Sequence, residues 1–310
     1  MDLLWPIKWV IELILVTFHN LFVGVGIASA SGISWVLAIV GLVLVVRAAL
    51  IPIFVKQIKS TRNMMLVQPE LQKLQKKYKG KTDRESKERF AKEQMALYKR
   101  TGSNPLSSCL PVLLQMPIFF SLFIVLNTAQ QDLAGVGSMV KGLASSFSQA
   151  EIFGAKLSAT FFGSDDVNVK IIAGIMIVLM SASQFITQKQ IMSKNQNPAT
   201  QNSQFMQTQK IMLYALPLVF LFSGLTFPLG VMTYWLVSNF WTMGQQFVVI
   251  RNMPTPGSPA HEAREDRLVK KGKITREEPK AIEAADEAEE EKPPQRVQPV
   301  SKNRAKKKKK

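Results

Sequence analysis

Five apolar runs decide what this chain can fold into. Each approaches the roughly 20 residues that a helix needs to cross the hydrocarbon core of a bilayer. The runs lie at about 33–55, 106–128, 169–188, 211–227 and 229–250. The sequence therefore predicts an all-α, polytopic membrane protein with five transmembrane helices. A tight turn is expected between the last two helices, at Phe227-Pro228-Leu229-Gly230, because Pro and Gly mark such turns.

Positive charge lies on alternate connections between these runs. Residues 56–100 carry 14 Lys or Arg and 5 Asp or Glu, and residues 189–210 carry three Lys and no acid. Residues 251–310 carry 17 basic and 11 acidic side chains, and the net charge of the whole chain is +17. Cytoplasmic loops of membrane proteins are enriched in Lys and Arg. We therefore expect the N-terminus to lie outside the cell and the C-terminus to lie in the cytoplasm.

Residues 1–31 are predicted to form an outer amphipathic helix that lies in the membrane interface. Lys8, Glu12 and His19 make a polar stripe at helical spacing, and apolar residues make the opposite face. Tryptophans near the start of the helix also suit an interface. The alternative is a cleaved signal peptide or an additional span, because residues 28–30 resemble a signal-peptidase site.

Residues 32–56 are predicted to be the first span, and residues 57–104 a cytoplasmic antiparallel helical hairpin. Apolar residues recur at helical spacing along one face of each hairpin helix. Gly80 can end the first hairpin helix. Thr82 and Glu85 then match a capping box for the second. A solvated linker would not need these signals, so the hairpin is the favoured interpretation.

Composition divides the rest of the chain into four parts. Asn104 and Pro105 fit the N-cap and the first helical position of the second span. The C-terminal part is rich in charge and Pro and cannot bury a core, so we expect it to be disordered. The predicted parts are a second span at 105–128, an outer loop at 129–168, spans three to five at 169–250 with a cytoplasmic loop at 189–210, and a disordered basic tail at 251–310.

Arg47 lies within the first apolar run. A guanidinium at mid-bilayer costs a few kcal/mol, so intramembrane charges usually face protein or water and usually have a function. A snorkelling arginine near a span end is the alternative. Arg47 precedes the inner end of its run by about 12 Å of helix, and the apolar runs contain no carboxylate that could pair with it. We therefore expect Arg47 to attract acidic or polar groups transiently.

Polar and aromatic side chains in the other spans accompany Arg47. A single polar residue in a transmembrane helix more often hydrogen-bonds to a neighbouring helix than serves as a functional group. Together with Arg47 they indicate a hydrated cavity that opens most easily to the cytoplasm. The candidate residues are Arg47, Gln115, Gln184, Gln188, Trp235 and Asn239.

Motifs of catalysis and of metal binding are missing from the sequence. Cys109 is the only cysteine, and His19 and His261 are the only histidines. Phosphate-binding loops, nucleophile elbows and zinc-binding HExxH motifs are absent. We therefore expect this protein to have no enzymatic activity, no metal site and no cofactor. An unpaired intramembrane cation suits a cation channel poorly, and no inverted repeat of the transporter kind is evident. A small-solute transporter or channel is nevertheless the alternative function.

Four stretches of the chain, taken together in this order and at these spacings, form a pattern that is highly specific for one protein family. They are Val46–Pro52 with Lys56-Gln57; Gln68–Leu74 with Lys79; Asn104–Leu106 with Cys109–Pro111 and Gln115–Phe119; and Phe227–Gly230 with Tyr234-Trp235, Ser238-Asn239 and Gln245-Gln246. Between about Trp5 and Arg251 the chain resembles the YidC/Oxa/Alb family of membrane protein insertases. The resemblance is to the short bacterial type of Gram-positive bacteria and actinobacteria, which lacks a large outer domain.

This resemblance implies a five-span core whose hydrophilic groove opens to the cytoplasm and the lipid and is closed outside. Arg47 matches the groove arginine of the family. Trp235 and either Gln188 or Gln184 match other groove positions, and the sequence does not choose between the two glutamines. Members insert nascent membrane proteins into the bacterial plasma membrane, alone or with the Sec translocon, and carry out no enzymatic reaction.

The basic end of the tail resembles the tails through which some members bind ribosomes. Contact with anionic lipids is an equally strong interpretation of such a run. No specific nucleic-acid sequence is expected as a partner. The residues concerned are Lys306, Lys307, Lys308, Lys309 and Lys310.

Overall fold

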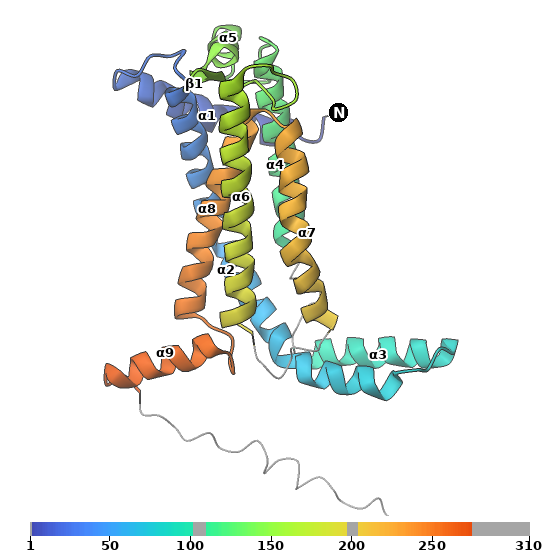
Figure 1. Ribbon diagram of the computed structural model, residues 1–310. Coiled ribbons are helices and arrows are strands. Elements are labelled where there is room, and N and C mark those ends of the chain that lie inside the picture. The colour runs from blue at the N-terminus through green and yellow to red at the C-terminus, as the bar shows by residue number, and fades with distance from the viewer. Residues whose placement is uncertain (1, 102–109, 197–203, 275–310) are drawn as a thin grey trace, which may run out of the picture. The chain divides into compact units, whose positions relative to one another are not determined.

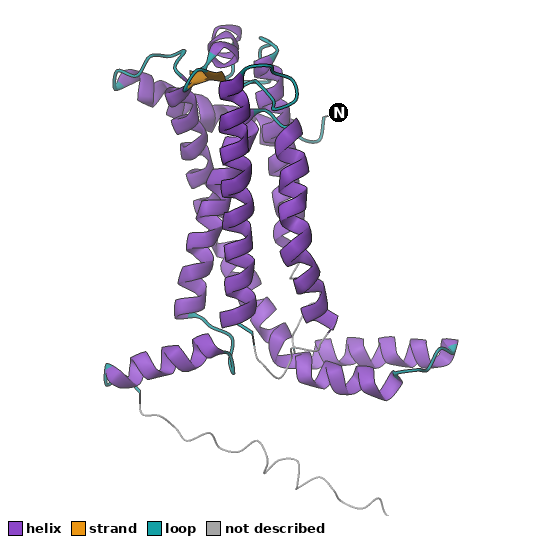
Figure 2. Cartoon of the chain, viewed as in Figure 1, coloured by secondary structure: helices purple, strands orange, loops and turns teal. Residues whose placement is uncertain are grey.

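Long helices make up most of this protein, and the only strands among the described residues form a short hairpin near one end (Figure 2). The computed structural model describes residues 2–101, 110–196 and 204–274. Residues up to Arg264 belong to one unit and those from Glu265 onward to a second. The elements are α1 (Trp5–Gly24), α2 (Gly32–Tyr78), α3 (Arg84–Arg100), α4 (Leu110–Gln130), α5 (Lys141–Gln149), β1 (Glu151–Ile152), β2 (Ala155–Lys156), α6 (Val167–Lys194), α7 (Gln204–Thr226), α8 (Leu229–Asn252) and α9 (Pro259–Lys270).

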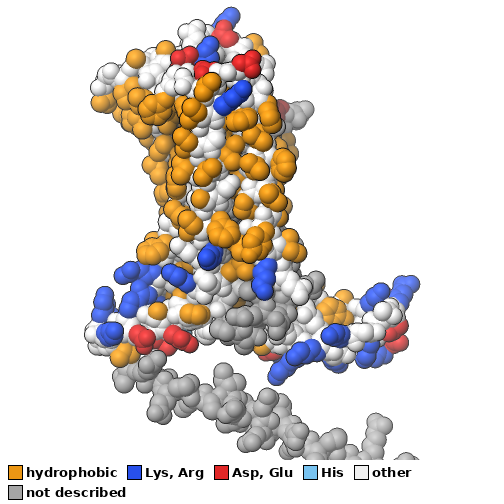
Figure 3. Space-filling view, viewed as in Figure 1, with side chains coloured by type: hydrophobic (Ala, Val, Ile, Leu, Met, Phe, Trp, Pro, Cys, Tyr) orange, Lys and Arg blue, Asp and Glu red, His pale blue; other side chains and the backbone are white. Residues whose placement is uncertain are grey.

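Five of the described helices are long and apolar enough to cross a membrane. They are α1, α2, α4, α6 and α7. Their exposed side chains include many large hydrophobic residues, and Figure 3 shows these as an apolar belt along the bundle with charged residues toward both ends. This pattern is typical of helices that face lipid rather than water. The predicted fold class, an all-α polytopic membrane protein, is confirmed.

Hydropathy and packing give different answers to the question of whether α1 or α8 is one of the five spanning helices. By hydropathy α1 qualifies and α8 does not. Figure 1, however, shows α8 running alongside α6 within the bundle, while α1 lies across the helix ends. Polar residues such as Asn239 lower the hydropathy of α8, although most of its first turns are buried against other helices. α8 therefore lies within the bundle although its hydropathy does not mark it as a span.

The polar stripe of α1 does not face water. Lys8, Glu12 and His19 are all buried against the rest of the protein. The exposed residues of α1 instead include several large apolar side chains, with Trp5 48% and Trp9 41% exposed. The sequence thus indicated an amphipathic pattern without stating which face packs against the protein, and in the structure that face is the polar stripe. An exposed tryptophan-rich face still suits a membrane interface.

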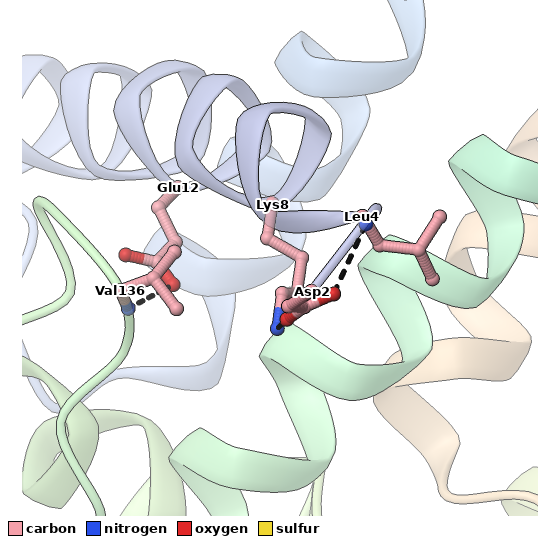
Figure 4. A network of polar contacts seen from close by, with 5 residues as sticks. All are labelled: Asp2, Leu4, Lys8, Glu12 and Val136. Carbon is pink, nitrogen blue, oxygen red and sulfur yellow. Dashed lines mark hydrogen bonds and ion pairs between the residues drawn. The ribbon is translucent and has the colours of Figure 1, made fainter.

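Glu12 fastens α1 to the segment that follows α4. Its carboxylate accepts hydrogen bonds from the backbone N–H groups of Val136 at 2.8 Å, Gly137 at 2.7 Å and Met139 at 3.3 Å. Figure 4 shows the bond from Val136. Gly135 lies so close to this carboxylate that a Cβ there would stand 2.1 Å from Glu12 Oε1. On the same helix Lys8 pairs with Asp2.

His19 and Trp35 join α1 to α2. Their rings stack with centroids 3.9 Å apart, and His19 Nε2 donates to the Ser29 carbonyl at 3.0 Å. Phe147 of α5 packs edge-on against Trp35, at 5.2 Å between centroids. These residues belong to a core that extends from α1 through α2, α4 and α5 to α8. A second core lies between α6, α7 and α8 and includes Met180 and Phe220.

The predicted outer loop at 129–168 contains regular structure. It holds α5 and an antiparallel hairpin in which Ile152 of β1 pairs with Ala155 of β2. Phe153 and Gly154 make the turn with φ of 51° and 78°. Its Gly and Ser content suggested a loop, but Phe147 and Leu157 are fully buried and hold this segment against the bundle.

The first span and the first hairpin helix are one continuous helix. α2 runs for 47 residues through Pro52 and Pro69, so the break expected between residues 56 and 57 is absent. Figure 1 shows the second part of α2 turning away from the bundle to lie along α3. Proline removes a backbone hydrogen bond and bends a helix without necessarily ending it.

The antiparallel hairpin is formed by the end of α2 and by α3. Gly80, with φ of 83°, follows the end of α2. The N-cap of α3 is Asp83, whose side chain accepts from the Ser86 N–H at 2.7 Å, rather than the predicted Thr82. Across the hairpin the ring of Tyr78 packs against Phe90, at 5.8 Å between centroids. Lys77 also pairs across it with Glu93 at 2.8 Å.

We expect the hairpin to lose stability in acid. The Lys77 ammonium and then the Tyr78 hydroxyl lower the pKa of Glu93, and the backbone N–H of Ser86 lowers the pKa of Asp83. Carboxyl groups with pKa values lowered by folding stabilise the folded state above their unfolded pKa and lose this contribution as the pH falls through the folded value. The contribution should therefore be complete above about pH 5 and decline below it.

Limited proteolysis of the full-length protein around Gly80, between pH 7 and pH 3, measures this loss. Glu93→Gln should make cleavage less dependent on pH. Glu88→Gln is the control, because Glu88 pairs with Arg84 inside α3 and makes no contact across the hairpin among the bonds described. If both variants kept the pH dependence of the parent protein, the cross-hairpin carboxylate would not be its source.

Two features of the chain after the bundle differ from the predicted tail. α8 continues to Asn252, and α9 forms at Pro259–Lys270 where disorder was expected. Ser258 precedes α9, accepts from the His261 N–H at 3.3 Å and is followed by Pro, which is the signature of a helix start. The predicted start of the second span at Asn104-Pro105, and residues 275–310, lie outside the described residues.

Candidate functional site

Arg47, Gln115 and Tyr234 come together from three helices. Arg47 lies on α2, Gln115 on α4 and Tyr234 on α8. Gln115 Nε2 donates to the Tyr234 hydroxyl, and the Arg47 guanidinium is close enough to Tyr234 to interact with it electrostatically. Tyr234 is only 2% exposed, whereas Arg47 is half-buried. We call these three residues the arginine cluster.

No ion pair joins Arg47 to a carboxylate among residues 2–101, 110–196 and 204–274. Its guanidinium carbon lies 5.8 Å from the centroid of the Phe54 ring, one face of which it covers. Gln115 Oε1 is buried and has no hydrogen-bond partner. A buried unpaired acceptor is costly. The arginine cluster therefore holds an uncompensated cation and an unused acceptor, which a visiting polar group could satisfy.

Trp235, next to Tyr234 in the chain, belongs to an aromatic cluster. It stacks on Phe119 at 4.9 Å between centroids and meets Phe220 and Phe227 edge-on, each at 5.4 Å. These contacts join α4, α7 and α8 beside the arginine cluster. Trp235 therefore forms part of an aromatic wall, and its ring is half-buried.

The two candidate glutamines of α6 have different surroundings. Gln188 Nε2 donates to Gln209 Oε1 of α7, and Gln188 lines a pocket of 230 Å³ with Gln57 and Gln246. Gln184 is half-buried and is not among the described residues that line this pocket. Between the two, the structure thus places Gln188 in a polar cavity.

Asn239 makes a contact between helices. It is 8% exposed, and its Nδ2 lies 3.5 Å from the Met180 carbonyl oxygen of α6. This long hydrogen bond suits the general role of intramembrane polar residues in holding helices together. Five of the six predicted residues therefore divide into the arginine cluster, the aromatic cluster, the pocket lined by Gln188 and this contact of Asn239, and Gln184 belongs to none of these. Lys306 to Lys310 lie outside the described residues.

Tyr234 was missing from the candidate residues predicted from sequence. A signal for it existed, since a tyrosine in an apolar helix must find a partner for its hydroxyl when buried. Gln57 and Gln209 were also missed, because one lies beyond the apolar run of its helix and the other before it. The part of the chain that the structure describes contains no group of three or more His, Cys, Asp or Glu side chains placed to hold a metal ion.

Comparison with known proteins settles the family. Residues 26–256 match the family model described as 60Kd inner membrane protein. The chain belongs to this family. A relative from Tropheryma whipplei (strain Twist), named membrane protein insertase YidC, is 42% identical over 315 residues, which are 98% of this chain and 96% of the relative. The resemblance to insertases that the four sequence stretches indicated is confirmed.

Two further relatives in the family carry the same printed name. One, from Streptomyces avermitilis, is 47% identical over 274 residues, which are 86% of this chain but 61% of the relative. The other, from Bifidobacterium longum, is 37% identical over 318 residues, which are 98% of this chain and 95% of the relative. This chain therefore spans less than two thirds of the Streptomyces protein and nearly all of the Bifidobacterium protein.

Proposed function

We infer that this multi-pass membrane protein is a membrane protein insertase with a non-enzymatic role. The observation that carries the inference is the 42% identity to an insertase over 98% of the chain. The arginine cluster supports it, because a half-buried cation without a carboxylate partner in the described residues suits transient attraction better than ion conduction. Its substrates would be nascent membrane proteins.

The arginine cluster gives this activity a physical basis. A nascent apolar segment that must carry a polar tail across the bilayer faces the cost of moving polar groups through hydrocarbon. A hydrated groove that ends at Arg47 would shorten this path, and the guanidinium would draw in acidic tail residues. The membrane potential can add about 2.3 kcal/mol per charge per 100 mV. Transfer of the apolar segment into lipid then drives release without a nucleotide.

We propose that the basic end of the bundle faces the cytoplasm of a bacterium whose plasma membrane contains the protein. The hairpin, the end of α6, the start of α7 and the end of α8 lie at this end (Figure 1), and their Lys and Arg residues favour a cytoplasmic position on the positive-inside rule. The N-terminus would then lie outside. The hairpin provides a docking surface for partners, and the insertase would act alone or beside the Sec translocon.

Site-specific photocrosslinking to a stalled nascent membrane protein tests the proposed function. A photoreactive residue at position 47 or 235 should crosslink to the apolar segment of the nascent chain. The same residue at position 222, where Phe222 is 69% exposed on α7, is the control and should crosslink mainly to lipid. Absence of nascent-chain crosslinks from 47 and 235, together with solute flux in liposomes, would favour a small-solute transporter or channel.

The basic tail gives a separate prediction. Deletion of residues 302–310 removes Lys302, Arg304 and the five terminal lysines and should weaken co-sedimentation with ribosomes. The loss should be largest at low salt, because contacts to phosphate release counterions and weaken as salt rises. Sedimentation at about 50 mM and about 300 mM salt measures this loss, because electrostatic contacts become strongly screened over this range. Unchanged co-sedimentation would leave anionic lipids as the partner of the tail.

A further inference from the structure

The pocket beside Gln188 lies where four helices meet at the basic end of the bundle. α2, α6, α7 and α8 each contribute to its wall, and its volume is 230 Å³. In Figure 1 the lower ends of α6, α7 and α8 spread apart above the bend of α2. The polar residues that line it are Gln57, Thr61, Arg62, Gln188, Gln209, Gln246 and Thr255. We call it the glutamine pocket.

The polar groups of the glutamine pocket suit an anion. Arg62 is the one charged residue among the described lining residues, and no described carboxylate lines the pocket. Guanidinium, carboxamide N–H and hydroxyl groups are the donors that bind phosphate oxygens, and the guanidinium does so in a forked geometry. Thr61 Oγ1 is buried without a hydrogen-bond partner, so one donor of the set is unused. An oxyanion between Arg62 and Thr61 would satisfy both.

The rest of the pocket wall is apolar. Ile58, Ile191 and Val249 line it together with two methionines, Met65 and Met212. Met212 is 42% exposed, so the pocket reaches the lipid-facing surface of α7. A free inorganic anion would gain nothing from contact with this apolar surface. The glycerol and first methylene groups of a lipid would bury it, which is favourable.

The depth of the pocket also indicates a lipid. Exposed lysines stand next to its lining residues on three helices, at Lys56 and Lys59 on α2, Lys189 on α6 and Lys210 on α7. Adjacent residues of a helix differ by only about 1.5 Å along its axis, so these lysines mark the level of the pocket. Basic residues just beyond a span lie among the headgroups and attract anionic ones.

The segment after α8 covers one side of the pocket. The Thr255 N–H donates to Asn195 Oδ1 at 2.8 Å, and its hydroxyl lies 3.3 Å from Met65 Sδ. Thr255 is only 3% exposed. These contacts join the segment after α8 to α6 and α2, whereas Met212 on the α7 side of the pocket is 42% exposed. A ligand would therefore enter from the bilayer.

We propose that the glutamine pocket binds the phosphate of an anionic phospholipid from the leaflet at the basic end of the bundle. Arg62 and Thr61 bind the phosphate oxygens, Gln188, Gln209 and Gln246 bind the polar headgroup beyond it, and Met212 contacts the start of an acyl chain. The lipid would join α2, α6, α7 and α8. This site is separate from the arginine cluster and does not depend on the insertase function.

Native mass spectrometry of the full-length protein with added phosphatidylglycerol tests the site. The parent protein should retain one phosphatidylglycerol more strongly than phosphatidylcholine. Arg62→Gln, which removes the charge but keeps a similar length, should weaken this binding about tenfold, the effect of losing about 1.4 kcal/mol from one charge-assisted contact. Lys59→Gln is the matched control, since it removes a charge three residues away on α2 but outside the pocket, and it should weaken binding much less than Arg62→Gln does.

Equal weakening by Arg62→Gln and Lys59→Gln would overturn the proposal, because it would leave only general attraction to a basic surface. Displacement of the lipid by millimolar inorganic phosphate would assign the pocket to a free anion. Displacement by an acidic nascent-chain peptide would assign it to the substrate. Either result would overturn the lipid assignment.

A second measurement does not depend on the folding of a variant. Parent protein irradiated with a photoactivatable phosphatidylglycerol should be labelled in the peptides that contain Gln57–Arg62 or Gln188–Ile191. Labelling confined to other peptides would contradict the proposal. Insertion activity is not read in either experiment, so failure of the lipid site and failure of the insertase function remain distinguishable.

Discussion

Arg47→Ala should lower the insertion of substrates whose translocated tails carry acidic residues by about tenfold, as loss of one charge-assisted contact worth about 1.4 kcal/mol implies. Arg47 is half-buried and has no ion-pair partner among the described residues, so its charge is available to a substrate. Arg47→Lys keeps the positive charge and should largely preserve insertion. Reconstitution into liposomes with a protease-protection assay measures the inserted fraction.

Two controls separate attraction from structural damage. A substrate with an uncharged tail should insert equally well with the parent protein and with Arg47→Ala. Lys59→Ala removes an exposed charge from the same helix outside the arginine cluster and should leave insertion of the acidic substrate unchanged. If the parent protein, Arg47→Ala and Arg47→Lys inserted the acidic substrate equally well, electrostatic attraction would not be the role of Arg47.

The fold class followed from the sequence because apolar length is a nearly local property. A run such as 169–188 must form a spanning helix whatever surrounds it. Boundaries that depend on distant contacts did not follow. α2 continues through Pro52 and Pro69 because its second part packs along α3, and nothing near residue 56 records that contact.

The faces of α1 show the same limit more sharply. Helical periodicity separates Lys8, Glu12 and His19 from the apolar residues, but it does not state which face meets protein. Glu12 is buried because three backbone N–H groups of a segment more than 120 residues later bind it. Partners of this kind are not encoded in the local pattern, so the sequence does not indicate that the stripe is buried.

The sequence identified a site residue only where that residue was unusual for its surroundings. Arg47 stands out in an apolar run, whereas Tyr234 does not, since tyrosine is common near membrane interfaces. Gln115 and Tyr234 are 119 positions apart, and only the packing of α4 against α8 brings them together. Likewise Gln188 differs from Gln184 through its contact with Gln209 on the neighbouring helix rather than through its own sequence context.

Glu12→Ala should be the most destabilising substitution on α1. It leaves the N–H groups of Val136, Gly137 and Met139, of which the last is buried, without their acceptor, and loss of hydrogen bonds to one buried carboxylate costs about 3 kcal/mol. Glu12→Gln keeps an acceptor oxygen and should cost less. Thermal unfolding in detergent, followed by protease cleavage of residues 130–140, measures both the stability and the local release of this segment.

Gly135→Ala tests the same contact from the opposite side. A Cβ at Gly135 would stand 2.1 Å from Glu12 Oε1, so the alanine must displace the carboxylate, and it should expose residues 130–140 to protease as Glu12→Ala does. Asp165→Ala is the control, because it removes an exposed carboxylate from the same end of the bundle. Equal stability of Glu12→Ala and Asp165→Ala would show that the carboxylate does not hold α1 in place. If both Glu12→Ala and Gly135→Ala release the segment, α1 is held across the bundle by its buried polar stripe, and its exposed tryptophans are left to face the membrane.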